Sequence, residues 1–149
     1  MRDADPTNER DRPVPPRRRG DPRRRLGALG EQIAAEHLRR LGFVIVERNV
    51  RTRHGEIDLI AVDGKGTLVF AEVKTRRASN PRRGLCPEQQ PLAWLKHSQR
   101  SRLRRLAQAW LYETAARRPR ARTIRFDAIG VIVDGRDRLL RLDHIEGAW

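Results

Sequence analysis

The chain reads GEIDLIAVDGKGTLVFAEVK from residue 55 to residue 74, and this stretch predicts a β-hairpin with a charged end. Two apolar runs flank Asp63-Gly64-Lys65-Gly66, a strong hairpin signal. If residues 64–66 form a three-residue loop with Gly66 in the left-handed conformation, Val62 pairs with Leu68.

Continued along both strands, this register opposes further pairs that share one face of the sheet. The pairs are Ile60 with Phe70, Asp58 with Glu72, and Glu56 with Lys74. The other face then carries only apolar side chains, namely Ile57, Leu59, Ala61, Val69, Ala71 and Val73. A register shifted by one residue would mix the two faces, so the hydrophobic pattern argues against it.

In this register Asp58 and Glu72 have Cβ atoms about 4.5–5.5 Å apart. Two ionised carboxylates at about 5 Å repel by roughly 3 kcal/mol at an effective dielectric of about 20. Lys74 can offset part of that repulsion. Two alternatives remain for the rest: a Mg²⁺ or Mn²⁺ ion, which prefers oxygen ligands, or arginine side chains from this basic chain.

These residues resemble the PD-(D/E)XK nuclease superfamily, in which an Asp on one hairpin strand is followed by Glu-X-Lys on the next. The matching positions are Asp58, Glu72 and Lys74, with Val73 as the X residue. Restriction endonucleases and archaeal Holliday-junction resolvases belong to this superfamily. The resemblance implies that Asp58, Glu72 and the Val73 carbonyl hold Mg²⁺ or Mn²⁺. Lys74 would then orient a water or steady developing negative charge.

More of the chain, nearly everything from about Leu26 onward, is similar to a narrower group, the YraN-like proteins (uncharacterised protein family 0102). The matching segments are Gly30-Glu31, Leu41-Gly42-Phe43, Arg48-Asn49 and residues 55–60, 69–76, 103–111, 125–127 and 144–149. The chain departs from that pattern at Gln99, where relatives usually have Lys, and Lys96 is the candidate substitute one turn earlier. Residues 79–97 are also longer and richer in proline than usual.

The composition indicates one domain with a polyanionic partner. The 149 residues carry a formal net charge of +14, from 33 Lys plus Arg against 19 Asp plus Glu. Nucleic acid is the first candidate partner and an anionic membrane surface the second. Because no run approaches about 18 apolar residues, we expect no membrane span. The lone Cys86 allows no internal disulfide, which fits a reducing cytoplasm.

Residues 1–25 predict a disordered tail rich in Arg and Pro, and residues 26–149 the folded domain. The tail arginines either contact phosphates or are simply solvated. We expect the first helix over residues 27–41, stopped by Gly42. Its apolar face carries Leu26, Leu29, Ile33, Ala34, His37 and Leu41, with Glu31 at the margin.

Glu31 has two interpretations. In the superfamily, a Glu from such a helix often serves the metal site, so Glu31 is a candidate catalytic residue and metal ligand. Alternatively, it is an N-terminal-turn Glu favoured by the helix dipole. His37 is expected to be a packed or rim histidine.

The remaining pattern predicts a strand at residues 43–50, a basic loop at 51–54, a loop at 76–91, a helix at 95–116, and strands at 123–133 and 138–145. Trp110 is expected in the core, and Asp127 is expected to hold an Arg in the fold. Several polar side chains are either nucleic-acid contacts or solvated surface. They are Arg51, Arg53, His54, Arg76, Lys96, Gln99 and Arg102.

A helix between the third and fourth strands allows a parallel crossover. We therefore expect a single α/β domain with a central mixed β-sheet flanked by helices, of the restriction-endonuclease-like type. The leading functional hypothesis is a Mg²⁺-dependent nuclease of structured or branched DNA, with DNA favoured over RNA. The alternatives are a catalytically silent nucleic-acid-binding protein and a protein with an acidic protein partner. A homodimer stays open, since junction resolvases are typically two-fold dimers.

Overall fold

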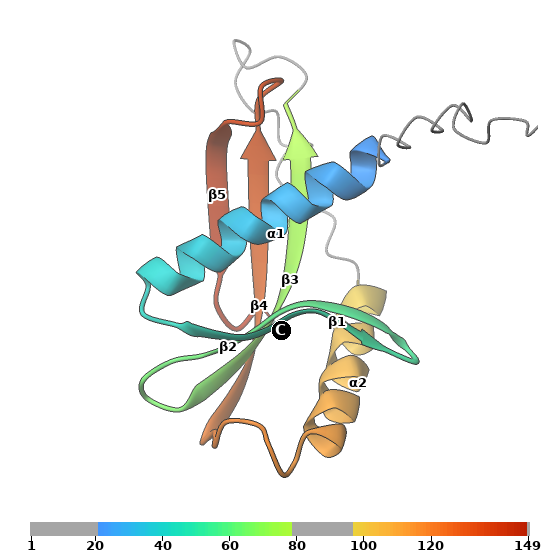
Figure 1. Ribbon diagram of the computed structural model, residues 1–149, viewed down its shortest axis with the longest axis vertical. Helices are drawn as coiled ribbons and strands as arrows, with labels where there is room; N and C mark the ends of the chain where they lie inside the picture. Colours follow the sequence, from blue (N-terminus) through green and yellow to red (C-terminus); the bar gives the residue numbers. More distant parts are fainter. Residues whose placement is uncertain (1–20, 79–96, 149) are drawn as a thin grey trace, which may run out of the picture.

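The computed structural model describes residues 21–78 and 97–148. Within these ranges, the helices and strands follow one another in the order that the sequence predicts (Figure 1). The elements are α1 (Pro22–Arg40), β1 (Val44–Thr52), β2 (Gly55–Val62), β3 (Thr67–Arg77), α2 (His97–Glu113), β4 (Thr123–Val133) and β5 (Leu139–Ile145). The strands form one five-stranded sheet in the order β1-β2-β3-β4-β5. Only β3 and β4 pair in parallel, so the expected α/β domain with a mixed sheet is confirmed.

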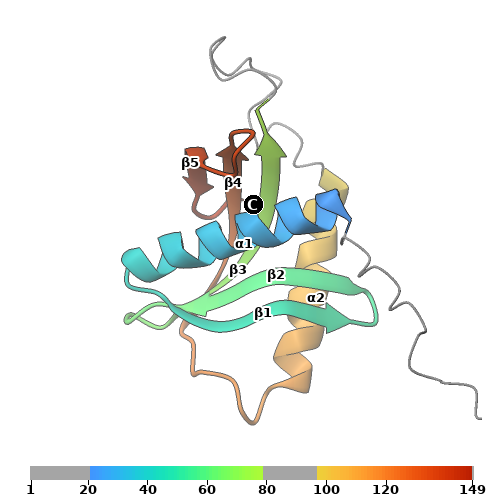
Figure 2. The same ribbon diagram turned by 45° about the horizontal axis from the view of Figure 1, so that its top comes forward.

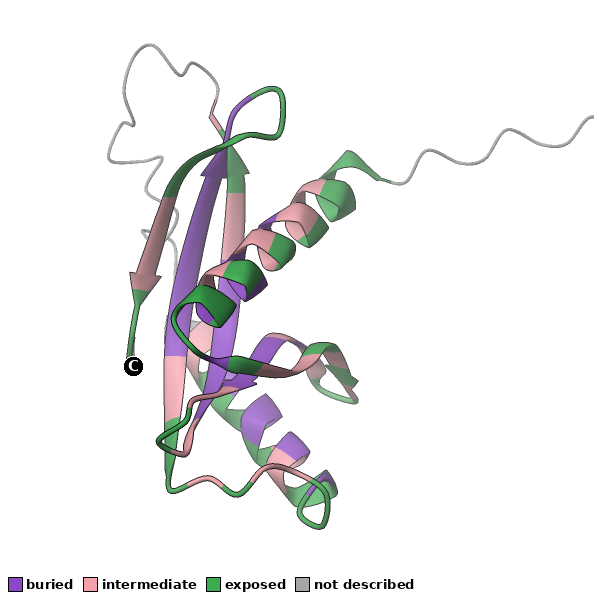
Figure 3. Cartoon of the chain, turned by 60° about the vertical axis from the view of Figure 1, so that its left-hand side comes forward, coloured by how far each residue is buried: buried purple, intermediate pink, exposed green. Residues whose placement is uncertain are grey.

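The two helices cover opposite faces of this sheet and create two apolar clusters. The cluster under α1 contains Ala34, Ala35, Leu38, Phe43, Leu59, Ala61, Val69, Ala71, Val73, Ile129, Val131 and Val133. The cluster under α2 contains Ile57, Ile60, Leu68, Phe70, Leu103, Leu106, Ala107 and Trp110. The strands are buried where α1 crosses them (Figure 3). Because β3 and β4 are covered on both faces, their sequences contain nearly continuous runs of apolar residues.

The hairpin between β2 and β3 has the predicted loop. Gly66 has φ +84°, in the left-handed region that favours glycine. Asp63 Oδ1 accepts hydrogen bonds from the backbone N–H groups of Lys65 at 2.9 Å and Thr67 at 2.7 Å. The predicted pairs Val62–Leu68 and Ile60–Phe70 follow from this loop and are confirmed.

Beyond this region the predicted register is wrong, because β2 and β3 part. The β2–β3 ladder ends at Leu59–Ala71, so Asp58 and Glu72 lie just past it instead of pairing, as do Glu56 and Lys74. β3 stays paired with β4 as far as Arg77, whereas β2 continues with β1. The β1–β2 hairpin therefore turns away from the other three strands (Figures 1 and 2). We call this opening the fork.

The fork also changes the predicted faces. Ile57 packs in the α2 cluster with Ile60, whereas Leu59 packs in the α1 cluster. The hydrophobic pattern predicts Ile57 and Leu59 on one face. The two residues therefore pack in different layers on either side of Asp58, where the β2–β3 ladder has ended.

α1 begins five residues earlier than expected. Asp21 caps the helix by accepting the Arg23 N–H at 3.0 Å, and Pro22 occupies the first turn. Residues 22–25 of the predicted tail therefore belong to this helix, while residues 1–20 lie outside the described residues. The buried face also differs, since it is centred on Gly30, Ala34, Ala35 and Leu38, and Leu41 is exposed.

The other expected elements differ mainly at their ends. β1 extends to Thr52, so only Arg53 and His54 remain in the turn, and α2 ends at Glu113. Residues 95 and 96 lie outside the described residues. The predicted core position of Trp110 is confirmed, and its Nε1 donates to Glu47 Oε1 at 3.1 Å.

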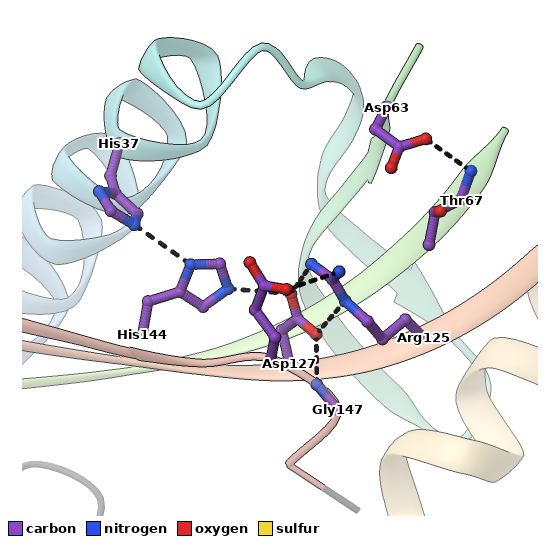
Figure 4. A network of polar contacts seen from close by, with 8 residues as sticks. His37, Asp63, Thr67, Arg125, Asp127, His144 and Gly147 are labelled. Carbon is purple, nitrogen blue, oxygen red and sulfur yellow. Dashed lines mark hydrogen bonds and ion pairs between the residues drawn. The ribbon is translucent and has the colours of Figure 1, made fainter. Parts of the chain in front are cut away.

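Asp127 holds the fold together, as expected, through a network of polar contacts (Figure 4). Arg125 donates to both carboxylate oxygens at 2.8 Å, and the Gly147 N–H donates at 3.0 Å. His144 Nε2 lies 2.9 Å from Asp127 Oδ2, and His144 Nδ1 lies 3.2 Å from His37 Nε2. His37 is therefore a packed, partly buried histidine, and this network joins α1, β4 and β5.

Candidate active site at the fork of β2 and β3

Asp58 lies on β2 at the point where the strands part. Its Oδ2 accepts a hydrogen bond from the Val73 N–H at 2.7 Å, so the side chain bridges the gap that the ladder leaves. Burial, and then the charge of Glu72, raises the pKa of Asp58 to about 7, although the Val73 hydrogen bond opposes this shift. Glu31 raises the same pKa further and Lys74 lowers it. Asp58 is thus the centre of a group of mutually interacting charges.

Glu72 and Lys74 are two residues apart on β3, so their side chains leave the strand on the same side. Glu72 is buried, with 8% of its surface exposed. Lys74 Nζ lies 2.5 Å from Glu72 Oε1 and forms an ion pair with it. The pair combines a carboxylate with a cation next to Asp58, as the sequence predicts for this end of the hairpin.

Glu31 reaches the site from α1. The side chain is partly buried and hydrogen-bonds with the side chain of Asn49 on β1. Burial is the main cause that raises the pKa of Glu31; the charge of Glu56 adds to it, while the Asn49 bond and Arg48 oppose it. Asn49 has φ +51°, a left-handed conformation that asparagine tolerates. The sequence segments Gly30-Glu31 and Arg48-Asn49 therefore meet beside Asp58.

A groove of about 570 Å³ opens in front of these carboxylates. Its lining combines three arginines with three acidic residues and is formed by Arg24, Arg25, Gly27, Ala28, Glu31, Asn49, Arg51, Glu56 and Asp58. Arg24 and Arg25 fall within the predicted tail, yet they belong to the first turns of α1. The Asp21-Pro22 pair, an N-cap followed by a favoured first helical residue, is the sequence signal that locates them.

The donor chemistry of this site fits a hard divalent cation, because it offers carboxylate oxygens and the Val73 carbonyl. The carboxylates are nevertheless dispersed. Across residues 21–78 and 97–148, no three His, Cys, Asp or Glu side chains stand close enough to hold one ion together. The predicted ligand set of Asp58, Glu72, Val73 and Glu31 surrounds the fork, and cation binding would require Glu31 and the Glu72–Lys74 pair to readjust.

The predicted nucleic-acid contacts fall into separate groups. Arg51 lines the groove with Asp58 and lies 3.9 Å from Glu56 Oε2. Arg53 and His54 line a different hollow, of about 400 Å³, against α2. Arg102 of α2 lies beside Gly55, where a Cβ atom would stand 3.4 Å from its Nε.

The remaining predicted contacts lie farther along the chain. Arg76 is exposed on β3, and Gln99 is partly buried on α2. Lys96, the candidate substitute for the lysine of relatives, is outside the described residues, so its prediction stays open.

Together, these features define a small α/β protein whose mixed sheet presents carboxylates and a lysine at a strand fork beside a groove lined by both arginines and acidic residues. The chain belongs to Uncharacterised protein family UPF0102, whose model matches residues 30–131. It is 41% identical over 125 residues to a UPF0102 protein of Corynebacterium efficiens, covering 84% of this chain and 92% of that protein. It is 45% identical over 126 residues to one from Symbiobacterium thermophilum, covering 85% and 97%.

A UPF0102 protein of Mycobacterium avium is 45% identical over 123 residues, covering 82% of this chain and 88% of the relative. Residues 30–131 of the family match include Glu31, the fork and α2, whereas the first turns of α1, with Arg24 and Arg25, precede that range. In the part of the chain that the structure describes, no helix has the length and apolar character needed to cross a membrane.

Proposed function

We propose that this protein is a Mg²⁺- or Mn²⁺-dependent phosphodiesterase that cleaves nucleic acid, with a fold of the PD-(D/E)XK type. The observation that carries the proposal is the position of Asp58. Its carboxyl group lies at the fork and accepts a hydrogen bond from the Val73 N–H. It also interacts electrostatically with Glu72, Glu31 and Lys74. Such a concentration of acidic groups in a partly desolvated site is typical of a functional centre.

Each residue has a distinct role in the proposed site. Asp58, Glu72 and the Val73 carbonyl would hold the cation, with Glu31 contributing from α1. The chemistry supplied by bound Mg²⁺ or Mn²⁺ is polarisation of the phosphate, activation of a water and neutralisation of the leaving oxygen. Lys74 would orient that water or stabilise developing negative charge through its ammonium protons.

The groove arginines support a nucleic-acid substrate. Arg24, Arg25 and Arg51 flank the carboxylates and would neutralise the phosphates on either side of the scissile bond. Contacts of this kind follow the backbone, depend strongly on salt, and carry little sequence information. We therefore propose a structured or branched DNA substrate rather than a short recognition sequence, with DNA favoured over RNA and the cytoplasm as the compartment.

A second candidate is a nucleic-acid-binding protein without catalytic activity. The observation that favours it is the Glu72–Lys74 ion pair, which engages one of the carboxylate oxygens needed for a cation. The dispersed carboxylates point in the same direction. In this case the groove arginines would bind DNA, and Asp58 would serve only to join β2 to β3.

A cleavage panel distinguishes the two candidates. Branched, flapped, single-stranded and duplex DNA are incubated with wild-type protein in Mg²⁺, Mn²⁺ or EDTA, and binding is measured in parallel in EDTA. The phosphodiesterase proposal predicts cation-dependent cleavage that Asp58→Asn and Glu72→Gln abolish while both variants still bind DNA. Glu36→Gln, at an exposed carboxylate on α1, is the matched control and should cleave normally.

Two results would count against catalysis. Tight binding without cleavage of any substrate by folded wild-type protein would favour the silent binder. Cleavage that persists unchanged in Asp58→Asn would assign the activity to a contaminant or another site.

A further inference from the structure

Among the described residues, β5 is an edge strand that is less protected than the opposite edge. The sheet order places β1 and β5 at its two ends. β1 carries a register shift at Ile45–Glu47, a left-handed Asn49, and the like charges of Arg48 and Arg51. Bulges and charges of this kind prevent an edge from pairing with another strand.

β5 is less protected, because its charged residues, Arg141 and Asp143, have opposite signs. It pairs with β4 without interruption from Arg141 to Ile145, and the register shift next to Leu140 lies outside that segment. Figure 3 shows β5 as exposed in one part and intermediate in the other, alongside the buried part of β4. Leu139, Leu140 and Ile145 are 47%, 45% and 47% exposed, which is a large apolar content for an outer strand. Within residues 21–78 and 97–148, the edge therefore offers both backbone without a strand partner and apolar surface.

The sequence of β5 is complementary to itself when read in the opposite direction. In an antiparallel pair with Leu142 opposite its own copy, Arg141 faces Asp143 of the other chain, and Asp143 faces Arg141. Within one chain, Arg141 Nε already lies 2.8 Å from Asp143 Oδ1, and both side chains reach solvent. Two strands in this register would bring four charges of alternating sign together.

Other registers lose this match. A shift of two residues places Arg141 opposite Arg141 or Asp143 opposite Asp143, and like charges directly opposed are destabilising. A shift of one residue places Leu142 opposite the charged Arg141 or Asp143. We propose that β5 binds the β5 strand of a second copy of this chain in the register centred on Leu142, giving a two-fold symmetric dimer with a continuous sheet.

α1 supplies a second contact for the same dimer. The His37–His144 contact places α1 above β5, and the C-terminal end of the helix passes beyond the edge of the sheet (Figures 1 and 2). Leu41, one turn after His37, is 51% exposed. In the proposed register, Leu140 of the second copy lies opposite His144, beneath this overhanging end. Leu41 of each copy would pack against Leu140 of the other copy, so the dimer would contain this contact twice, once on each side of its two-fold axis.

The contact is small, since one strand pair and two helix ends bury less than the roughly 1,600 Å² of a standard interface. The dimer should therefore form in a concentration-dependent manner. The proposal is independent of the proposed phosphodiesterase activity, because its residues lie outside the fork and the groove.

Sedimentation velocity of the full chain over a concentration series, with bound nucleic acid removed, tests this inference. Wild-type protein should show a monomer–dimer equilibrium. Arg141→Asp and Asp143→Arg should each raise the dissociation constant about tenfold or more, since every substitution creates two like-charge pairs. The combined variant Arg141→Asp/Asp143→Arg should restore the wild-type constant, because it exchanges the charges and keeps the match.

Arg48→Asp makes the same charge change on the β1 edge and should leave association unchanged. Leu41→Asp should weaken it, and circular dichroism and thermal unfolding would establish that each variant is folded. The inference is overturned if folded wild-type protein remains monomeric throughout the series, if Arg141→Asp associates like wild type, or if the combined variant is as weak as the single ones.

Discussion

Gly30 of α1 lies so close to Thr75 of β3 that a Cβ atom on Gly30 would stand 1.7 Å from Thr75 Oγ1. The helix backbone therefore packs directly on β3, with no room for a side chain between them. Glu31 is the next residue, and its side chain forms a hydrogen bond with Asn49. A single glycine thus sets how near α1 brings its carboxylate to the fork.

Gly30→Ala should lower the free energy of unfolding by about 1–3 kcal/mol, the usual range for an overpacked core. Urea unfolding of the variant measures this change. Gly27→Ala in the same helix is the matched control, because a Cβ atom there would meet no other part of the fold within 4 Å and alanine favours the helix. Adding Thr75→Ala should recover part of the loss. Equal stabilities for the two single variants would contradict the close packing.

Asp58 makes the cation-free protein less stable as the pH rises. The unfolded chain releases the Asp58 proton near pH 4, whereas the folded protein retains it up to the raised pKa of about 7. Between these values the folded state binds more protons, so its stability falls with increasing pH and the loss is complete above pH 7. Asp58→Asn should remove this loss of stability with rising pH, because asparagine does not titrate. In EDTA, the variant should gain roughly 2–4 kcal/mol relative to wild type between pH 5 and pH 8. An unchanged pH profile would show that Asp58 titrates normally.

Cation binding should release a proton from Asp58. Near neutral pH its carboxyl group is partly protonated, because its pKa is about 7, and a cation requires the ionised form. Calorimetry of Mn²⁺ binding in buffers of different ionisation enthalpy should detect proton release at pH 6.5 and much less at pH 8.5. Affinity should rise over the same range. Asp58→Asn should abolish the release, while pH-independent binding in wild type would place the cation elsewhere.

The two carboxylates that contact Arg125 should differ widely in their contribution to stability. Asp127→Ala removes a buried group and leaves Arg125 without its main partner, which should cost about 3–5 kcal/mol. Glu146→Ala removes an exposed partner at 2.9 Å and should cost less than about 1 kcal/mol. Chemical denaturation at pH 7 measures both values, and similar losses would contradict the structural role of Asp127.

Asp127 should also sensitise the protein to acid. Burial alone would raise its pKa, but the hydrogen bonds from His144 and Arg125 outweigh burial and hold the pKa below its usual range. Its contribution is therefore complete above the ordinary pKa near 4 and is lost as the pH falls further. The difference between wild type and Asp127→Ala should narrow below pH 4. A difference that stays constant would mean that Asp127 does not titrate differently on folding.

Local features make much of the fold predictable. The loop at Gly66 and the apolar alternation specify the pairing from Val62–Leu68 to Ile60–Phe70, because turn geometry and burial act over a few residues. The same kind of signal locates α2 and its buried Trp110. The predicted start of α1 is misplaced because the many arginines before residue 26 indicate a disordered tail. The Asp21-Pro22 pair, which indicates a helix start, is a weaker signal in the sequence.

The arrangement of the candidate site is harder to predict from the sequence. The types and spacing of Asp58, Glu72 and Lys74 are visible in the sequence, but their predicted pairing extends a regular ladder that ends at Leu59–Ala71. The contact between Glu31 and Asn49 has no local signal, since these residues are brought together by the packing of α1. Arg24 and Arg25 likewise join the groove only because the helix begins at Pro22.

The amino-acid sequence by itself determined the kinds of element, the hairpin loop and the chemical groups near its charged end, because propensity, turn chemistry and periodicity are short-range properties. Only the tertiary structure decided that β2 and β3 separate at Asp58. That separation results from competition between distant partners: β3 stays paired with β4 along its whole length, while the twisted β1–β2 hairpin cannot follow.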